Sequence, residues 1–251
     1  MSLNYKMERK VCTQALQAGP RLSLCFAPED RYIMDMRWRA LIFDRDGTLF
    51  DSLAVILKAF NYAIEPFADR IPSDSEWFAA FGPAEPEVMA HFIPVSRKGE
   101  AYSRFMDYYK EHFDGIVLFP EVAGMLAGAK ERGAKIGLFT GGGLESTRFC
   151  LQQKKLLSLF DILITGDQVV HPKPHPEGIL RALVDLNVDA SQTLVVGDSA
   201  ADVEAGSRAG TATALVRWSP YTNGFHAAIQ PDYVFSKVVH FRDFIFQEEK
   251  S

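Results

Sequence analysis

The sequence lacks the features that mark secreted, membrane and disulfide-bonded proteins. It holds only three cysteines, Cys12, Cys25 and Cys150, and none of them lies in a CxxC pair. An odd, scattered set predicts reduced thiols rather than a disulfide framework, a zinc site or a redox site. No apolar stretch approaches the roughly 20 residues that span a bilayer, and the amino-terminal region lacks the apolar segment of a signal peptide. We therefore expect a cytoplasmic protein without a membrane partner.

Positive charge is also scarce. The 27 lysines and arginines stand against 32 aspartates and glutamates, a formal net charge of −5. This balance leaves no basic footprint for nucleic acid, and an anionic ligand has to be bound through local charges. The 251 residues, 47% of them hydrophobic, suffice for one sizeable core or two modest domains.

The most informative segment is ALIFDRDGTLFDS, residues 40–52. Its first four residues are continuously apolar, which is typical of a parallel strand covered on both faces. Asp44 lies just past the strand's carboxyl end, where open α/β sheets bind their ligands, and Asp46 follows before a turn at Gly47. Carboxylates this close repel unless they share a cation or one holds a proton. The segment predicts a site for a divalent metal and a phosphate, with one carboxylate as nucleophile and the other as acid and base.

Two further segments carry complementary chemistry. A strand predicted over residues 135–139 ends in Thr140 and three glycines, Gly141 to Gly143. The hydroxyl and the backbone N–H groups there are suited to donate to phosphate oxygens. Lys173 lies between two prolines, which restrict its backbone and hold the ammonium in place.

A third buried strand is predicted over residues 193–196. It is followed by Asp198 and, after two alanines, by Asp202. Carboxylate oxygens are the ligands that Mg²⁺ prefers, together with water and substrate phosphate. We expect these acids to complete the metal site.

Taken in order, the four segments resemble the haloacid dehalogenase-like hydrolase superfamily over roughly residues 38–217. The resemblance implies four catalytic residues: Asp44 as nucleophile, Asp46 as general acid and base, Thr140 as a hydrogen-bond donor to the phosphate, and Lys173 as the neutralising cation. It implies phosphate binding by Thr48, Thr140, Gly141 and Lys173. It implies Mg²⁺ binding by Asp44, Asp46 (through its backbone carbonyl), Asp198 and Asp202.

The whole-chain pattern is most similar to phosphoglycolate phosphatase and its pyrophosphatase relatives, including the Tyr108-Tyr109 and Phe119-Pro120 pairs. This resemblance implies an Mg²⁺-dependent phosphatase that hydrolyses a small phosphate monoester through an aspartyl phosphate. The alternatives are an inorganic pyrophosphatase and a phosphomutase of the β-phosphoglucomutase type, although such mutases usually have valine or isoleucine where Thr48 stands. A dehalogenase, which has no use for Asp46, and a non-catalytic binding protein are the weaker readings.

One residue departs from this pattern. Most capped enzymes of the superfamily carry an apolar residue where Arg45 stands. The Asp-Arg-Asp-Gly-Thr-Leu wording resembles histidinol-phosphate and heptose-bisphosphate phosphatases, but those lack a large helical cap and carry a cysteine-rich zinc loop. We predict that Arg45 is a surface or salt-bridged residue; the alternative is an extra anion contact for a distal carboxylate or phosphate.

The alternating order of strands and helices predicts an α/β fold with a doubly wound, mostly parallel sheet. We assign residues 38–52 and 118–251 to this core domain. Residues 53–117 contain little that reads as strand and are predicted to form an inserted α-helical cap. Residues 1–37 are an extension, either a β-hairpin added to a sheet edge or a product of upstream start assignment.

The expected elements are set by periodicity and by turn residues. Helices are expected over residues 53–67, 120–132, 144–157, 176–186 and 200–209. Strands are expected over residues 40–43, 135–139, 160–165 and 193–196, with edge strands at 211–217 and 233–235.

Substrate specificity is expected to come from the cap. The Phe81-Gly82-Pro83 turn is the best candidate for a loop over the phosphate, because glycine permits close approach. Most of the polar cap residues are expected to be solvated: Glu85, Glu87, His91, Arg97, Lys98 and Arg104.

Two competing motifs are weaker. The Gly141-Gly142-Gly143 run partly imitates a dinucleotide fingerprint, but the third glycine of that motif is missing and Asp161 precedes its strand. Of the six histidines, His171 and His175 stand four residues apart, at the HxxxH spacing. His171 and His175 flank Lys173, and we expect them to be surface loop residues rather than substrate contacts.

Overall fold

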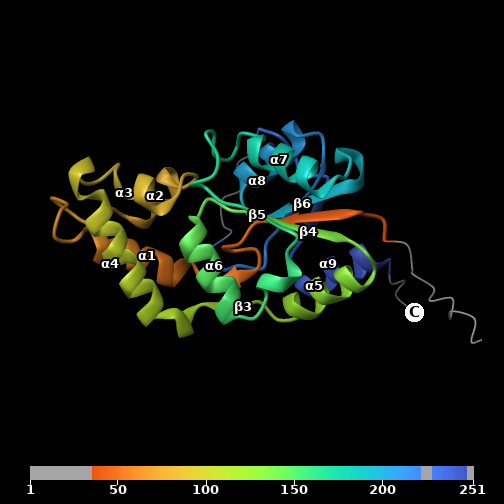
Figure 1. Cartoon of the computed structure of the whole chain (residues 1–251), viewed down its shortest axis with the longest axis horizontal. Helices are drawn as coiled ribbons and strands as arrows, with labels where there is room; N and C mark the ends of the chain where they lie inside the picture. The colour runs from red at the N-terminus through yellow and green to blue at the C-terminus, as the bar shows by residue number, and fades with distance from the viewer. Residues whose placement is uncertain (1–35, 222–227, 248–251) are drawn as a thin grey trace, which may run out of the picture. The chain divides into compact units, whose positions relative to one another are not determined.

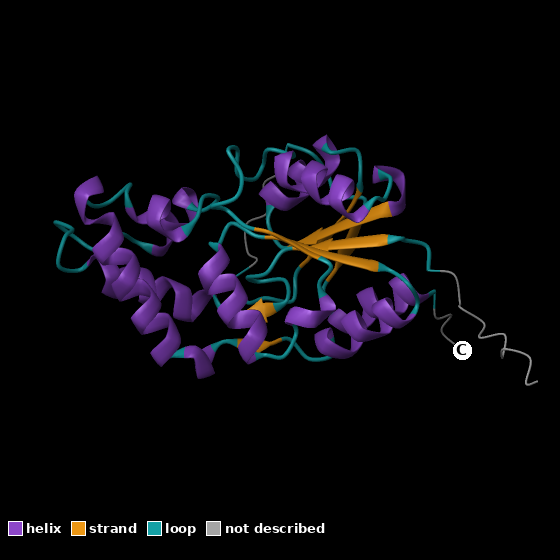
Figure 2. Ribbon diagram, in the orientation of Figure 1, coloured by secondary structure: helices purple, strands orange, loops and turns teal. Residues whose placement is uncertain are grey.

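A computed structural model describes residues 36–221 and 228–247. Its main sheet has six parallel strands in the order β5-β4-β1-β6-β7-β8. These strands are β1 (Ala40–Phe43), β4 (Lys135–Phe139), β5 (Ile162–Ile164), β6 (Thr193–Gly197), β7 (Ala212–Val216) and β8 (Tyr233–Phe235). Helices cover both faces (Figures 1 and 2). The predicted doubly wound α/β fold is confirmed.

Strand β1 is central because it pairs with both β4 and β6. Its side chains alternate between two apolar clusters: Leu41 and Phe43 belong to one, and Ile42 belongs to the other. A strand that is apolar on both faces is buried on both, as the sequence predicts. Because β1 and β6 are parallel neighbours, their carboxyl ends, at Phe43 and Gly197, lie at the same edge of the sheet.

Five helices flank the sheet. Helices α7 (Glu177–Leu186) and α8 (Ala200–Arg208) cover one face in Figure 1, and α5 (Val122–Glu131) and α9 (Val238–Phe246) cover the other. Helix α6 (Leu144–Gln153) follows β4 on the same side as α5. The described residues also form four short 3-10 helices: Val95–Arg97, Phe113–Gly115, Leu157–Leu159 and Ala190–Gln192.

A helical segment is inserted between β1 and β4. It consists of α1 (Leu53–Ile64), α2 (Asp74–Ala80), α3 (Glu85–Met89) and α4 (Lys98–Glu111). The chain enters and leaves it through a two-stranded antiparallel ladder, β2 (Phe50–Asp51) and β3 (Val117–Leu118). Because β2 and β3 hold the two ends of the insert together, the insert joins the core at one place, as a short loop would.

The inserted segment has its own apolar interior. Trp77 of α2 is completely buried and stacks on Phe60 of α1 with ring centroids 4.8 Å apart. Its indole N–H donates to Asn61 Oδ1 at 2.8 Å. Phe105 of α4 also packs against Phe60, with ring centroids 4.9 Å apart. Contacts between aromatic rings of α1, α2 and α4 thus hold the three helices together.

Some sequence predictions of the elements need correction. Strand β7 is not an edge strand, because it pairs with both β6 and β8. Helix α9 and the β2–β3 ladder were not predicted. The helix expected over residues 120–132 begins at Val122, because Glu121 has a φ of 70°. The hairpin or start-site prediction for residues 1–37 lies almost wholly outside the described residues.

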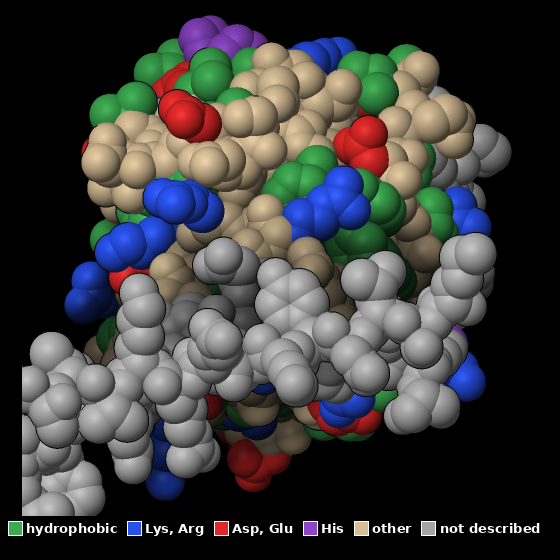
Figure 3. Space-filling view, turned by 90° about the vertical axis from the view of Figure 1, so that its right-hand side faces the viewer, with side chains coloured by type: hydrophobic (Ala, Val, Ile, Leu, Met, Phe, Trp, Pro, Cys, Tyr) green, Lys and Arg blue, Asp and Glu red, His purple; other side chains and the backbone are tan. Residues whose placement is uncertain are grey.

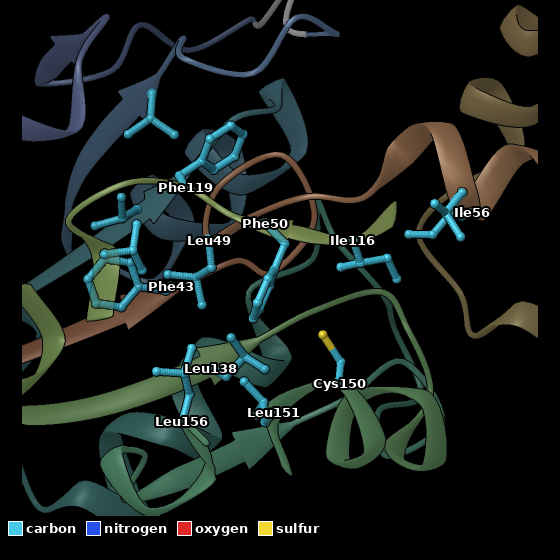
Figure 4. Close-up of a cluster of buried hydrophobic side chains, with 14 of the residues drawn as sticks. Phe43, Leu49, Phe50, Ile56, Ile116, Phe119, Leu138, Cys150, Leu151 and Leu156 are labelled. Atoms are coloured by element: carbon cyan, nitrogen blue, oxygen red, sulfur yellow. The ribbon is translucent and has the colours of Figure 1, made fainter. Parts of the chain in front are cut away.

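Cys150 lies on α6, and Figure 4 shows it within a cluster of buried apolar side chains that includes Phe50 and Leu151. Its thiol is free, as the sequence predicts. Burial raises the pKa of this thiol to about 11, which keeps it protonated and unreactive. Cys12 and Cys25 fall outside the described part of the chain.

The surface agrees with the modest net charge. On the face seen in Figure 3, acidic, basic and hydrophobic side chains of the described residues are interspersed rather than gathered by type. Among the described residues, every helix is too short or too polar to cross a membrane.

Gly178 in α7 tests the packing of this helix on the sheet. A Cβ at this position would lie 2.3 Å from Phe139 Cε2 of β4. We expect Gly178→Ala to lower the free energy of unfolding by about 1–3 kcal/mol despite the better helix propensity of alanine. Gly124 in α5 has no atom within 4 Å of its Cβ position, so Gly124→Ala should raise that free energy by about 0.5 kcal/mol. Urea denaturation of both variants measures the contrast, and equal effects would contradict it.

Candidate functional site

A cavity of about 470 Å³ opens at the carboxyl ends of β1, β4 and β6. Core loops line one side of it and the inserted helices line the other. Seven of the predicted site residues line it: Asp44, Asp46, Thr140, Gly141, Lys173, Asp198 and Asp202. These residues are far apart along the sequence but close in space, because parallel strands end at one edge of the sheet.

The structure does not bring Thr48 to this cavity. Thr48 is fully buried, and its hydroxyl has no hydrogen-bond partner in the structure. Its carbonyl oxygen accepts a hydrogen bond from the Trp218 indole at 2.9 Å. Its observed contact therefore ties the first loop to the region after β7.

The turn after β1 depends on Gly47. This residue has a φ of +83°, a left-handed conformation that favours glycine. A Cβ there would also lie 2.1 Å from Asp198 Oδ2. Any side chain at position 47 would thus displace a carboxylate of the site, which gives the glycine of the DxDG run a second physical reason.

Lys173 is the cation at the floor of the cavity. Its ammonium donates to Asp44 Oδ1 at 2.7 Å and to Asp202 Oδ1 at 2.5 Å. Burial lowers the pKa of Lys173, but Asp202 and Asp44 outweigh this and hold that pKa above its usual value. The other oxygen of Asp202 accepts from the backbone N–H and the hydroxyl of Ser199, the N-cap of α8. Asp202 is thus fixed by a capping box while it binds the lysine.

Three carboxylates crowd this single ammonium. Asp44, Asp198 and Asp202 each offer an oxygen, and these atoms lie within 4.8 Å of one another. Burial raises the pKa of Asp44 to about 7, with Asp202 and Asp46 adding to the rise and Lys173 opposing it. Burial, Asp44 and Asp202 together raise the pKa of Asp198 well above its usual value. The all-oxygen donors and the uncompensated negative charge fit Mg²⁺.

Asp46 has a different environment from Asp44. Its Oδ2 accepts from Arg45 Nε at 2.8 Å, and its Oδ1 accepts from the Ser52 hydroxyl at 2.6 Å. Ser52 precedes α1, but its side chain makes no cap hydrogen bond to that helix. The hydroxyl orients the acidic side chain instead. Both groups point the Asp46 carboxylate at the base of the inserted segment.

Arg45 is salt-bridged, as one of the sequence readings has it, but it is not a surface residue. It is only 2% exposed, and its Nη1 donates to the hydroxyls of Thr147 at 2.7 Å and Ser146 at 3.3 Å. Burial works against its charge, but Asp46 and the other neighbours together outweigh burial and hold the pKa of Arg45 above its usual value. A buried guanidinium needs several acceptors, and α6 supplies two of them.

The Arg45 network continues into the inserted helices. The Ser146 hydroxyl donates to Glu85 Oε1 at 2.5 Å, and the Gly143 N–H donates to Glu85 Oε2 at 2.8 Å. Glu85 is therefore buried at the cavity, although the sequence placed it among the mostly solvated cap residues. Ser52, Ser146 and Thr147 were missed, because isolated hydroxyl residues carry no sequence signal of a partner.

The Phe81-Gly82-Pro83 turn lines the cavity, and its place over a phosphate stays a prediction. Gly82 has a φ of +138°, and a Cβ there would lie 3.3 Å from the Lys173 carbonyl oxygen. The carbonyl oxygen of Gly82 also lies 2.9 Å from the Cβ position of Gly141. The backbone of the inserted segment thus comes close to the backbone of the loops that hold Lys173 and Gly141.

The other cap and loop predictions fall outside the cavity lining. Glu87 pairs with Lys98 and Arg97 pairs with Glu100 on the exposed side of the segment. His171 and His175 are exposed and lie against one another, with ring centroids 4.5 Å apart. Both behave as the surface loop histidines that the sequence predicts.

Comparison with known proteins places this site in a family. Residues 41–216 match the family described as haloacid dehalogenase-like hydrolase. The chain belongs to this family. The predicted resemblance is confirmed, and with it the prediction that the chain is an enzyme of the hydrolase class.

Curated relatives carry pyrophosphatase names. Pyrophosphatase PpaX of Bacillus mycoides is 30% identical over 204 residues, covering 81% of this chain and 94% of the relative. Pyrophosphatase PpaX of Bacillus cereus strain G9842 is 29% identical over the same shares.

Solved structures share the fold. A predicted phosphoglycolate phosphatase from Haemophilus somnus aligns with a TM-score of 0.72 and 22% identity, covering 85% of this chain and 99% of that one. A putative haloacid dehalogenase-like hydrolase from Bacteroides fragilis aligns with a TM-score of 0.69 and 24% identity, over 81% and 99%. CbbY from Rhodobacter sphaeroides, solved in complex with phosphate, aligns with a TM-score of 0.69 and 22% identity, over 80% and 94%.

Removing the buried guanidinium should strongly destabilise the protein. Arg45→Met leaves Asp46 bound to Ser52 alone and strips two hydroxyls of their donor. We expect the free energy of unfolding to fall by about 3 kcal/mol, the lower end for a broken buried pair. Arg97→Met, which removes an exposed pair, is the control and should cost about 0.5 kcal/mol or less. If urea denaturation shows a loss for Arg45→Met no larger than that for Arg97→Met, the buried Arg45 pair contributes no more to stability than the exposed pair.

The raised pKa of Asp44 predicts a pH-dependent cost in metal-free protein. The folded chain holds this proton up to about pH 7, whereas the unfolded chain releases it near pH 4. Stability should therefore fall as pH rises from about 4 to 7. Asp44→Asn, whose amide oxygen still accepts from Lys173, should raise the melting temperature at pH 8 by about 3 °C or more, and by less at pH 5. An unchanged or lower melting temperature at pH 8 in EDTA would contradict this.

Proposed function

We propose that the chain is an Mg²⁺-dependent phosphatase that hydrolyses a small phosphate monoester through an aspartyl phosphate on Asp44. The observation that carries the proposal is the placement of Lys173 between Asp44 and Asp202, with Asp198 as a third carboxylate, at the floor of a closed-in cavity. The family and the phosphatase names of its relatives support a phosphatase.

Asp44 supplies the nucleophile. One of its oxygens is held by the Lys173 ammonium, which leaves the other free to attack the phosphorus atom. The same ammonium lies where it can neutralise a phosphate oxygen, since a carboxylate attacks an anion only where positive charge offsets the repulsion. Mg²⁺ held by Asp44, Asp198, Asp202 and the Asp46 carbonyl supplies the further positive charge.

Asp46 moves the proton. It protonates the alcohol oxygen as the phosphate leaves, and it then takes a proton from the water that hydrolyses the aspartyl phosphate. Arg45 and Ser52 hold both of its oxygens in one orientation. The nucleophile and the acid thus have different cationic partners, Lys173 for Asp44 and Arg45 for Asp46.

Thr140 and Gly141 complete the phosphate site. Thr140 is buried at the end of β4, and its hydroxyl oxygen accepts from the Gly142 N–H at 3.1 Å. That contact uses a lone pair, so the hydroxyl proton is left to donate to a phosphate oxygen. Donors fixed in this way need no reorganisation as charge develops.

We also propose the domain division predicted above, with residues 53–117 as a cap over the core. The contacts that support it are those of the Phe81-Gly82-Pro83 turn and of Glu85 with core loops. Substrate access would then depend on movement of this segment about the β2–β3 ladder. The cytoplasmic location stays a prediction from the sequence.

Hydrolysis of inorganic pyrophosphate is the second candidate function. It is favoured by the names of the curated relatives, of which one is 30% identical. The same nucleophile, acid and cation would serve it, since pyrophosphate also carries a phosphoryl group on an oxygen leaving group.

Asp44→Asn tests the central assignment. We expect phosphate release to fall at least about 10³-fold, because the amide cannot form the phosphoryl intermediate. Wild-type protein in EDTA should lose release to a similar extent and recover it with Mg²⁺. Asp107→Asn, on the exposed side of α4, is the control and should retain the wild-type rate. Near-normal phosphate release by Asp44→Asn across a panel of phosphate esters and pyrophosphate would overturn the mechanism.

A further inference from the structure

The cavity walls differ sharply in chemistry. The floor is formed by the charged and hydroxyl groups described above, whereas the wall supplied by the inserted helices is almost entirely apolar. Besides Leu53 and Pro83, six apolar side chains of the inserted segment line the cavity, and these six are named the apolar wall: Ile56, Phe60, Phe78, Phe81, Val88 and Phe105. Four of the six are phenylalanine rings, which present flat faces and edges rather than polar atoms.

The apolar wall is a continuous surface. The ring centroid of Phe81 lies 5.7 Å from that of Phe60 and 5.6 Å from that of Phe78. The ring centroids of Phe60 and Phe105 are 4.9 Å apart. Phe78 is 38% exposed although it faces a cavity. Phe78 and Phe81 are the rings of this wall that are left partly uncovered. An apolar ligand group that covers them would be stabilised by burial of apolar surface.

Neither cation at the cavity is available to a second anionic group. Among the described residues that line it, the cations are Arg45 and Lys173. Lys173 is paired with Asp44 and Asp202 at the floor, where the reacting phosphate belongs. Arg45 is 2% exposed and is engaged by Asp46 and two hydroxyls. The geometry therefore argues against Arg45 as an extra contact for a distal carboxylate or phosphate.

The charge that the inserted segment does bring to the cavity is negative. Glu85 lies at the end nearest the core, and its two oxygens accept from Gly143 and Ser146. A distal carboxylate or phosphate on a substrate would meet this carboxylate and the apolar wall. It would lose much of its hydration without gaining a cationic partner among the described lining residues, which is costly.

From these contacts we propose the class of the substrate, an inference that rests on the proposed phosphatase function. The substrate is the phosphate monoester of an uncharged alcohol whose carbon skeleton is largely apolar and contains a ring. The phosphate lies at the Asp44 and Lys173 floor, and the ring lies against the apolar wall. A cavity of about 470 Å³ holds both groups.

The test compares esters that differ in the alcohol and not in its acidity. Benzyl alcohol and methanol are similarly weak acids, so benzyl phosphate and methyl phosphate have matched intrinsic reactivity. We expect kcat/KM with Mg²⁺ to be at least about tenfold higher for benzyl phosphate than for methyl phosphate. We expect phosphoglycolate and pyrophosphate, which carry a second anionic group, to be at least about tenfold poorer than benzyl phosphate.

Phe78 is the position for the matched variants, because its exposure makes it tolerant of substitution. Phe78→Ala should lower kcat/KM for benzyl phosphate about fivefold more than it lowers that for methyl phosphate. Phe78→Lys should move the preference toward phosphoglycolate, since it places a cation at the apolar wall. Ile71, an exposed apolar residue of the same segment that does not line the cavity, gives the controls Ile71→Ala and Ile71→Lys. Neither control should alter the ratios.

The outcomes separate the two claims. Phosphate release from phosphoglycolate or pyrophosphate that exceeds release from benzyl phosphate would overturn the substrate class and leave the phosphatase standing. Equal kcat/KM for benzyl and methyl phosphate would do the same. No phosphate release from any of the four compounds with Mg²⁺ would overturn the proposed function itself.

Discussion

The site depends on the balance of charge around the Lys173 ammonium. Asp44 follows β1 and Asp202 lies in α8 after β6, and the lysine binds both at 2.7 and 2.5 Å. Because burial penalises an unpaired charge, each of these groups needs the others to remain ionised. Asp198 leaves the cluster with more carboxylates than ammonium groups. That excess of negative charge suits a divalent cation, whose positive charge would in turn offset that of an anionic phosphate.

A second buried ion pair gives Asp46 a separate environment. Arg45 donates to one carboxylate oxygen of Asp46, and Ser52, which precedes the inserted segment, donates to the other. The two carboxylates of the DxD run therefore differ in partner, although they are only two residues apart. Division of this kind is how neighbouring carboxyl groups take different roles in a reaction. The same guanidinium connects through Ser146 to Glu85, so the inserted helices and the acid share one hydrogen-bond network.

Reaction and recognition come from different parts of the chain. The charged floor is built from loops at one edge of the parallel sheet, and the apolar wall is built from α1, α2, α3 and α4 or the turns between them. The paired β2 and β3 strands let the insert enter and leave the core at one point. In the proposed phosphatase, a core organised in this way would keep its chemistry while the insert decides which alcohol fits against it.

The sequence alone determined the central strands and the alternation of strands and helices. It also determined that Asp44, Asp46, Thr140 and Asp198 closely follow strands, and that Lys173 and Asp202 come in the segments after strands. These features are local: burial pattern, turn residues and chain direction all act within a few residues. The tertiary structure alone decided the partners of Arg45, which lie 101 and 102 residues away, and those of Glu85. It also decided that Thr48 is kept from the cavity and that β7 lies inside the sheet. Such contacts depend on how helices and strands pack, and packing brings together residues whose separation along the chain carries no periodic signal.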